Sequence, residues 1–418
     1  MTQSQHRRPV FAAFAVSRTG NRGAVSMLEA TIDHLASEPV NGVVHVFTVY
    51  PKDDAQLPPE PNVRLHSGTP QALIFKLIPL CLLYRLARLL RLPIPDSAWG
   101  RDMQALLETD VCLMIGGTTF NDAKPIKVPW NVACLLPAIL LRRKAMMYSQ
   151  TLGPFRKALN RWAARWCLKR MDFIAPRGPG SLEHVRGLGL GNKIEYLPDS
   201  AFSLRVSPEV EQEIRQRYAG WPRGKGVVGV SINTIVEARC KELGIDHHGA
   251  FVELMRRLLD EGYRIWLIPH SMRPGSKLRH NNDLVSLAEI LDRLGRPEGV
   301  HVIDEPYDCK RLRVLVGLTD YYVACRFHSM ISALCTGVPV ATFGWGHQKY
   351  IEVLHEFELD GYFWDGAELS GSALIAAFER IVREADSMRE RMRRNLPRVQ
   401  AASAANHQAA CRLAGVIG

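Results

Sequence analysis

The sequence predicts an α/β protein with two domains, each built around a parallel β-sheet. Short apolar runs alternate with amphipathic helical segments along most of the 418 residues, and that alternation is typical of parallel sheets covered by helices. Residues 207–226, which are rich in Pro and Gly, interrupt the alternation near the middle of the chain. At roughly 150 residues per domain the length also favours two or three domains. We therefore expect two Rossmann-like domains with a cleft between them.

The first domain is expected to span residues 1–206. The run 10–16 lies at the lower limit of length for the apolar part of a secretory signal, and Arg18 follows it almost at once, so a first buried strand is the favoured interpretation. The remaining strands are runs of apolar residues, and the helices are segments with apolar residues at helical spacing. Strands are expected at 9–16, 43–49, 111–115, 145–149 and 173–175, and helices at 24–37, 102–108, 159–171 and 181–188.

The second domain is expected to span residues 227–395, after a linker at 207–226 and before a tail at 396–418. It repeats the alternation of the first half, and several of its helices end at Gly residues. Strands are expected at 227–232, 264–268, 300–303, 321–324 and 340–343. Helices are expected at 250–261, 283–294, 310–317 and 329–335, with a long amphipathic segment at 372–395.

Composition limits the function classes. Hydrophobic residues make up 47% of the chain and charged residues 23%, which is ordinary for a globular protein. Nine scattered cysteines share no C-x-x-C spacing, which argues against a zinc site or a disulfide framework and favours a reducing, cytoplasmic compartment. The net charge of +11 favours anionic partners, but no nucleic-acid motif accompanies it, so no nucleic-acid partner is predicted.

The positive charge is concentrated in two stretches that contain no acidic residue. Residues 71–95 hold Lys76, Arg85, Arg88 and Arg91 within a nearly continuous run of Leu, Ile and Phe. This pattern suits a helix lying on the inner, anionic surface of a membrane, and equally an amphipathic helix packed on its own domain. Its arginines argue against a membrane-spanning helix.

Residues 141–170 form the second basic stretch, with nine Lys or Arg residues. Trp162 and Trp166 lie four residues apart and share a helix face. Packing of both tryptophans into the core is the expected arrangement, with a place at a membrane interface as the alternative.

Candidate binding residues follow the predicted strands, because ligands of parallel sheets bind beyond the carboxyl ends of the strands. Asn21 lies in the Gly-rich turn Gly20–Gly23 after the first strand, where backbone amides and a helix N-terminus approach a ligand. Gly117 ends the strand 111–115 and suits close backbone approach. Asp122 follows it and either accepts hydrogen bonds from a sugar hydroxyl or caps a turn. Arg177 follows the strand 173–175 and can grip a carboxylate or phosphate.

The sharpest local signal is the junction of the strand 321–324 with the next helix. Arg326 and His328 stand two residues apart, so an extended segment would turn both to one side, and Ser329 is expected to cap the helix. A cation, an imidazole and a helix N-terminus at one point suit an anionic ligand and proton transfer. Lys349 projects from the Gly-rich loop after the next strand, and His270 ends another strand of this sheet. No carboxylate stands at ligand spacing from these histidines, so no metal site is predicted.

These motifs give the chain a resemblance to the polysaccharide pyruvyl transferase family from Gly20 to about Leu354. The resemblance rests on Gly20-Asn21-x-Gly23, Ile115-Gly116-Gly117, the segments 150–155, 177–183 and 198–202, Pro269-His270, Lys349, and above all Arg326-Phe327-His328-Ser329 followed by 333–339. Three positions depart from the family pattern: Ala24 and Gly178 replace acidic residues, and Thr118 replaces a glycine.

The resemblance implies a fold similar to the two-domain GT-B glycosyltransferases, with acceptor binding in the first domain and donor binding in the second. It implies transfer of the pyruvyl group of phosphoenolpyruvate to a sugar diol of a cell-surface polysaccharide or its lipid-linked precursor, giving a pyruvate ketal and phosphate. Phosphoenolpyruvate is then the donor substrate, and no cofactor is implied. The positions that match donor-binding residues are Arg177, Arg326, His328 and Lys349, with His328 as the proton donor.

Two other function classes remain open from the sequence. A GT-B glycosyltransferase that uses a nucleotide sugar would share the fold and a basic donor site. A non-catalytic protein associated with the membrane or with a glycan-assembly complex would explain the departures from the family pattern and the two basic stretches.

Overall fold

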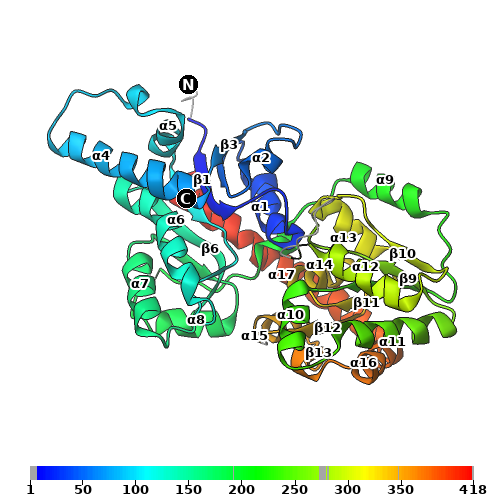
Figure 1. Ribbon diagram of the computed structural model, residues 1–418. Coiled ribbons are helices and arrows are strands. Elements are labelled where there is room, and N and C mark those ends of the chain that lie inside the picture. Colours follow the sequence, from blue (N-terminus) through cyan, green and yellow to red (C-terminus); the bar gives the residue numbers. More distant parts are fainter. Residues whose placement is uncertain (1–6, 192, 273–278, 280–281, 347, 417–418) are drawn as a thin grey trace. The chain divides into compact units, whose positions relative to one another are not determined.

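The chain folds into two compact units, each with its own parallel sheet and with helices on both faces of that sheet (Figure 1). The computed structural model describes residues 7–416 except 192, 273–278, 280, 281 and 347. Unit 1 comprises the described residues of 1–19, 27–204 and 401–418, and unit 2 comprises those of 20–26 and 205–400. The predicted α/β fold class with two Rossmann-like domains is confirmed.

Unit 1 is built on a seven-stranded sheet whose strand pairs are all parallel. The strand order is β3-β2-β1-β4-β6-β5, and β7 also pairs with β6. The central strands are apolar on both sides, as expected for a sheet covered on both faces. The strands are β1 (Val10–Val16), β2 (Val43–Thr48), β3 (Val63–Ser67), β4 (Val111–Met114), β5 (Thr118–Thr119), β6 (Lys144–Leu152) and β7 (Phe173–Pro176).

Two groups of helices cover this sheet. On one face, α6 (Val128–Leu141) packs against α4 (Ile78–Leu89), α5 (Arg101–Glu108) and α7 (Ala158–Leu168), and their buried side chains form one continuous core with the strands. The other group includes α1 (Arg22–Leu35) and the end of α17 (Ala385–Ala414), where the rings of His34 and His407 stack and Tyr148 of β6 contacts His407. Shorter helices complete the unit: α2 (Pro51–Asp54), α3 (Pro70–Ala72), the π-helix η1 (Leu73–Leu77) and α8 (Pro179–Arg186), with 3-10 turns at Asp96–Trp99, Pro125–Lys127 and Ser200–Ser203.

Unit 2 is built on a six-stranded parallel sheet of order β10-β9-β8-β11-β12-β13. Helix α11 (His247–Asp260) packs between α12 (Asp283–Leu294) and α16 (Gly371–Arg383), whereas α13 (Cys309–Gly317) packs against α9 (Pro208–Tyr218) and α14 (Phe327–Thr336). The strands are β8 (Val227–Ser231), β9 (Arg264–Leu267), β10 (Val300–Val302), β11 (Tyr321–Ala324), β12 (Val340–Gly344) and β13 (Phe363–Asp365). Helices α10 (Thr234–Glu242) and α15 (Gln348–Glu356) and a 3-10 turn at Gly366–Glu368 complete the unit.

The domain boundaries differ from the expected ones. The expected linker contains α9, which is capped by Ser207 and buries Ile214 and Tyr218 within unit 2. The expected tail is the continuation of α17, and from residue 401 it belongs to unit 1, where Ala410 and Cys411 are buried. The amphipathic segment 372–395 is two helices, because α16 ends before Glu384 and α17 begins at Ala385. Within the described chain, we find no helix that combines the length and the apolar character needed to span a bilayer.

Candidate functional site

The junction of β11 and α14 in unit 2 carries the strongest candidate site. Helix α14 begins at Phe327, directly after Arg326, so Arg326 is extended and His328 already lies in the first helical turn. The expected extended arrangement of both side chains is therefore wrong. Ser329 does not cap the helix either: its hydroxyl donates to the carbonyl of Arg326 at 2.8 Å, and its oxygen lies 2.8 Å from that of Ser231.

Arg326 forms a buried ion pair with Asp283, the first residue of α12. The guanidinium donates from Nε to Oδ2 at 2.8 Å and from Nη2 to Oδ1. The same carboxylate accepts the backbone amides of His270 and Ser271 at 3.1 and 3.0 Å. Burial raises the pKa of Asp283, and the Arg326 guanidinium and the two amides oppose that rise. Asp283 therefore ties the segment after β9 to the start of α14.

His328 packs directly on the backbone of Gly23. A methyl group at Gly23 would lie 2.5 Å from Nδ1 of His328 and 2.8 Å from its Cβ. No side chain larger than hydrogen fits there without displacing the imidazole. This contact gives a physical reason for the glycine in the Asn21-x-Gly23 motif.

Residues 20–26 belong to unit 2, so Asn21 lies in the same unit as His328. Oδ1 of Asn21 accepts the amide of Gly23 at 3.1 Å, in the first turn of α1. Asn21 also forms an antiparallel bridge with Ser271, and the amide of Arg22 donates to the carbonyl of His270 at 2.9 Å. The motif is thus attached to the segment after β9.

Lys349 lies beside the start of α14. Its Nζ is 5.1 Å from the centre of the Phe327 ring and 5.0 Å from that of Tyr350, and the side chain is partly exposed. The Phe327 ring in turn meets the His328 ring edge-on, at 5.1 Å between centres. The structure therefore brings a second cation to the junction that carries Arg326 and His328.

His270 is buried and stays neutral at physiological pH. Burial, together with the positive charges of Arg326 and His328, lowers the pKa of His270 to about 3. Its Nε2 lies 3.2 Å from the hydroxyl of Tyr322 on β11. His270 thus supports the site from within the core.

Arg177 lies in unit 1 and is paired inside it. Its Nη1 donates to Oδ2 of Asp199 at 2.5 Å and its Nε donates to Oγ1 of Thr151 at 2.8 Å. The side chain of Arg177 is 4% exposed and that of Asp199 is 0% exposed. The backbone of Gly117, with φ of +73°, lies next to this guanidinium. A Cβ at Gly117 would be 3.8 Å from Nη1 of Arg177.

Asp122 stabilises a turn of unit 1. Its carboxylate accepts the amide of Arg156 at 2.5 Å, the amide of Lys157 at 3.2 Å and Nδ2 of Asn160 at 2.8 Å. Burial raises the pKa of Asp122, but these hydrogen bonds outweigh it and hold the pKa below its usual range. Of the two interpretations drawn from the sequence, the contacts match the turn cap.

The structure gathers most of the predicted residues in unit 2 and leaves three in unit 1. Unit 2 holds Asn21, His270, Arg326, His328 and Lys349; unit 1 holds Gly117, Asp122 and Arg177. Sequence reasoning missed the partner carboxylates, Asp283 and Asp199. Asp199 lies in the segment 198–202 used for the family resemblance, so its pairing with a buried cation was open to inference, whereas Asp283 gave only the signal of an acidic residue at a helix start.

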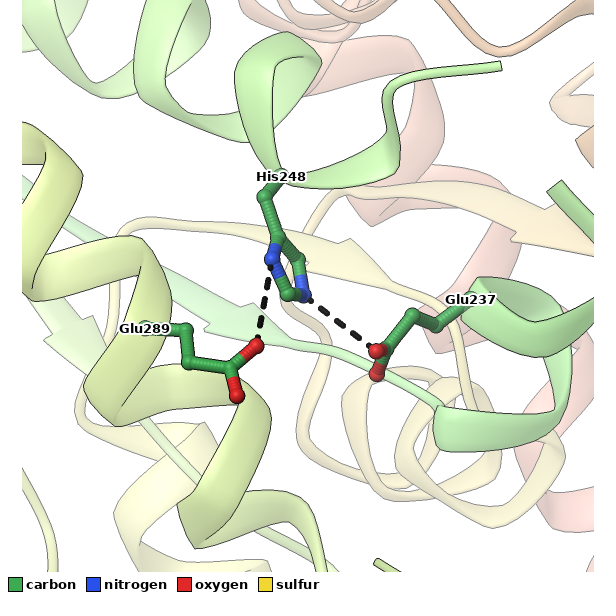
Figure 2. Close-up of side chains that lie close together, drawn as sticks. All are labelled: Glu237, His248 and Glu289. Carbon is green, nitrogen blue, oxygen red and sulfur yellow. Dashed lines mark ion pairs between the residues drawn. The ribbon is translucent and has the colours of Figure 1, made fainter. Parts of the chain in front are cut away.

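A separate cluster of unit 2 has potential metal ligands (Figure 2). Glu237, His248 and Glu289 come from α10, α11 and α12, and the imidazole lies between the carboxylates (Figure 2). Nε2 faces Glu237 at 3.5 Å and Nδ1 faces Glu289 at 3.6 Å. Because the two ring nitrogens point in opposite directions, a single ion can bind only one of them. Arg279 also pairs with both carboxylates, so this is an ion-pair network that joins the three helices.

Comparisons with known proteins identify the family of the chain. The sequence matches the family described as polysaccharide pyruvyl transferase over residues 21–347, which is well over half of the chain. The chain therefore belongs to the polysaccharide pyruvyl transferase family, a family of transferases of polysaccharide biosynthesis.

A curated relative is the amylovoran biosynthesis protein AmsJ of Erwinia amylovora. The two sequences are 20% identical over 277 residues, which are 65% of this chain and 65% of that protein. The match thus spans just under two thirds of the relative's length.

Solved structures of the same architecture establish the GT-B-like fold. S. aureus MnaA with UDP has a TM-score of 0.59 at 12% identity, and the alignment covers 98% of both chains. UDP-GlcNAc 2-epimerase from Neisseria meningitidis has a TM-score of 0.59 at 11% identity, covering 97% of this chain and 100% of that one. Anabaena HepE in complex with UDP-glucose has a TM-score of 0.53 at 14% identity, covering 97% and 99%. At these identities the likeness concerns the fold alone.

Proposed function

We propose that this chain transfers the pyruvyl group of phosphoenolpyruvate to two hydroxyl groups of a sugar in a cell-surface polysaccharide or its lipid-linked precursor. The products are a pyruvate ketal and phosphate. The observation that carries the proposal is the β11–α14 junction, where Lys349 lies beside Arg326 and His328. Arg326 and His328 lie within the segment matched by the family, and Lys349 follows its end at residue 347. In this proposal unit 2 binds the donor and unit 1 the acceptor, and no cofactor takes part.

The donor is a small polyanion with a carboxylate and a phosphate, so its site needs fixed cations. Lys349 supplies a partly exposed ammonium. A guanidinium has five N–H donors, and Asp283 accepts hydrogen bonds from Nε and Nη2 of Arg326. In this proposal Nη1 of Arg326 binds the anion. The amides at the start of α14 add a positive helix end.

His328 is proposed as the general acid. As an imidazolium it protonates the methylene carbon of phosphoenolpyruvate, which becomes the methyl group. The oxygen of one sugar hydroxyl then bonds to the central carbon. The oxygen of the second hydroxyl bonds to the same carbon as the bond between that carbon and the phosphate oxygen breaks. Of the two hydroxyl protons, one restores the imidazolium and the other leaves with phosphate, so the step balances. The packing of the ring on Gly23 fixes its position.

Arg177 enters the proposal through the family resemblance. Its guanidinium is buried against Asp199, so a variant at Arg177 would leave an uncompensated buried carboxylate and lose stability. Variants at Lys349 and His328 are therefore the informative ones for function.

The test is conversion of phosphoenolpyruvate labelled with ¹³C at its central carbon, followed by NMR, with a glycan extract of the native host as acceptor. The wild type is expected to convert the vinylic carbon into a saturated ketal carbon. His328→Ala is expected to lose about 100-fold or more of this activity, which is the usual contribution of a general acid, while keeping its fold. The exposed His355→Ala serves as the matched control. Full activity of His328→Ala would overturn the assignment.

A nucleotide-sugar glycosyltransferase is the second candidate. Structures that share the fold are described with UDP, UDP-GlcNAc or UDP-glucose, and the fold does not determine the donor. This candidate predicts binding of a nucleotide sugar, and no binding of phosphoenolpyruvate.

A further inference from the structure

The first basic stretch forms an exposed apolar surface in unit 1, on η1, on α4 and on the residues that follow α4 up to Leu92. Of the large hydrophobic side chains that are exposed in the described part of the chain, eight lie within residues 74–92. They are Ile74, Phe75, Leu82, Leu83, Leu86, Leu89, Leu90 and Leu92, with exposed fractions from 44% to 79%. We call these eight residues the apolar face.

This helix has two different sides. Leu77, Cys81 and Ala87 are buried, and Tyr84 packs partly buried against Trp99. That side attaches the helix to α6 and to the core of unit 1. Leu82, Leu86 and Leu89 follow the spacing i, i+4, i+7, which places them together on another side of the same helix. The segment is therefore packed on its own domain, as one of the two alternatives from the sequence expected, and it also presents an apolar ridge to solvent.

The charged residues within the stretch 71–95 are all basic. Residues 71–95 contain Lys76, Arg85, Arg88 and Arg91 and no acidic residue. Lys76 and Arg88 contact Asp102 and Asp96, pairs whose basic partners are 62% and 50% exposed. The pair of Arg88 and Asp96 is exposed on both sides, with Asp96 at 54%, and pairs of this kind are weak, whereas Asp102 is 20% exposed. No ion pair of Arg85 or Arg91 occurs among the described residues.

We propose that this helix docks the protein on an anionic phospholipid surface, with the apolar face inserted among the acyl chains and the four cations at the headgroup phosphates. An apolar ridge flanked by Lys and Arg is the pattern of helices that lie in a membrane interface. A surface that binds a partner protein, or a second copy of this chain, is expected to carry charges of both signs. Residues 71–95 carry basic residues alone. The inference goes beyond the pyruvyl transfer and holds for any donor, and it explains how a lipid-linked acceptor would reach the protein.

The test is sedimentation of the full chain with vesicles, without donor or acceptor. One set of vesicles contains phosphatidylglycerol and phosphatidylcholine in equal parts, and the other contains phosphatidylcholine alone. The wild type is expected to bind the anionic vesicles and to be released by salt, because electrostatic attraction to the headgroups is screened. Arg85→Gln/Arg91→Gln is expected to lower the partition coefficient by about fivefold per charge.

Leu82→Gln/Leu86→Gln tests the apolar face. These side chains are 51% and 50% exposed, so their replacement leaves the core intact, and affinity for anionic vesicles is expected to fall by about tenfold or more. Leu243→Gln/Ile351→Gln is the matched control in unit 2, with exposed fractions of 47% and 44%, and it should bind as the wild type does. Circular dichroism and the Tm of each variant check that the fold is retained.

A labelled cysteine maps the docking side. Eight of the nine native cysteines are buried and the ninth is partly buried, so Leu86→Cys can be labelled selectively with an environment-sensitive dye. The dye is expected to shift to the blue with anionic vesicles, whereas the same dye on Leu243→Cys should not shift. Absence of wild-type binding, equal binding of Leu82→Gln/Leu86→Gln, or a wild-type dimer that this variant converts to a monomer would overturn the proposal.

Discussion

At the scale of single residues, the contact between Gly23 and His328 gives the Asn21-x-Gly23 motif its physical meaning. The sequence suggested that glycines in this turn bring backbone amides to a ligand. The structure shows that Gly23 makes room for the imidazole of His328 on helix α14. The Asn21-x-Gly23 motif and the motif that contains Arg326 and His328 are therefore in direct contact, and the position of the imidazole depends on the glycine.

Gly23→Ala is expected to reduce pyruvyl transfer by tenfold or more, because the added methyl group lies within 2.5 Å of Nδ1 of His328 and must displace the ring. Overpacking of this kind also costs about 1–3 kcal/mol of stability. Turnover and Tm are the measurements. Gly220→Ala is the matched control, since a Cβ at Gly220 meets nothing within 4 Å. Wild-type turnover in Gly23→Ala would show that the ring is free to move without consequence.

The buried pair of Arg177 and Asp199 is the second residue-scale feature. Asp199→Ala is expected to lower the free energy of unfolding by about 3–5 kcal/mol, because it leaves a guanidinium buried without its carboxylate. Urea denaturation measures the loss. Arg177→Met/Asp199→Leu should recover most of it, since apolar side chains of similar size tolerate burial.

The comparison pair for this experiment is Arg215 and Glu211, whose side chains are 56% and 48% exposed. Glu211→Ala is expected to cost less than about 1 kcal/mol. If Asp199→Ala cost no more than Glu211→Ala, the buried ion pair would be refuted.

His247 predicts a pH dependence of stability. It is 3% exposed, and neither ring nitrogen has a hydrogen-bond partner among the described residues. Burial, and then the charge of His248, lowers the pKa of His247 to about 4. The unfolded chain binds the proton near pH 6.5, so it gains protons first as the pH falls. Stability from this group is therefore complete above about pH 6.5 and is lost as the pH falls toward 4, by up to about 3 kcal/mol.

Unfolding free energies between pH 7.5 and 4.5 test this, with His247→Leu against the wild type. The variant should lose less stability over that range, whereas His355→Leu, at an exposed histidine, should follow the wild type. Identical pH profiles for His247→Leu and the wild type would contradict the expectation.

At the scale of elements, the sequence predicted most strands and many helices, because buried parallel strands are short apolar runs with clear ends. It missed α6, which is apolar on nearly all sides and so lacks the periodicity that identifies a helix. It also misplaced the helix start at Ser329, because Ser is a common cap, whereas α14 begins directly after the strand and Arg326. Of the two tryptophans of α7, Trp166 packs partly buried against the core, but Trp162 is 65% exposed, so the expected burial of both was half right.

At the scale of the whole molecule, the sequence was sufficient for the fold class and the family, both of which rest on patterns local to strand ends. It was insufficient for the unit boundaries, because the end of α17 returns to unit 1 through contacts that no local pattern shows. It was also insufficient for the charge balance of the site, since the carboxylates that neutralise Arg177 and Arg326 are 22 and 43 residues away in sequence. Arg177 and Arg326 are both buried beside these carboxylates. Lys349 is the most exposed of the three cations.

Thermal unfolding of the purified chain with phosphoenolpyruvate, UDP or UDP-glucose tests the central claim most directly. At about 100 times its Kd, a ligand stabilises the folded state by about 2.7 kcal/mol, which shifts the Tm measurably. We expect phosphoenolpyruvate to raise the Tm of the wild type and of the control variant Lys225→Ala, but to raise that of Lys349→Ala much less. A rise with UDP or UDP-glucose and none with phosphoenolpyruvate would contradict the account and assign the chain to nucleotide-sugar chemistry.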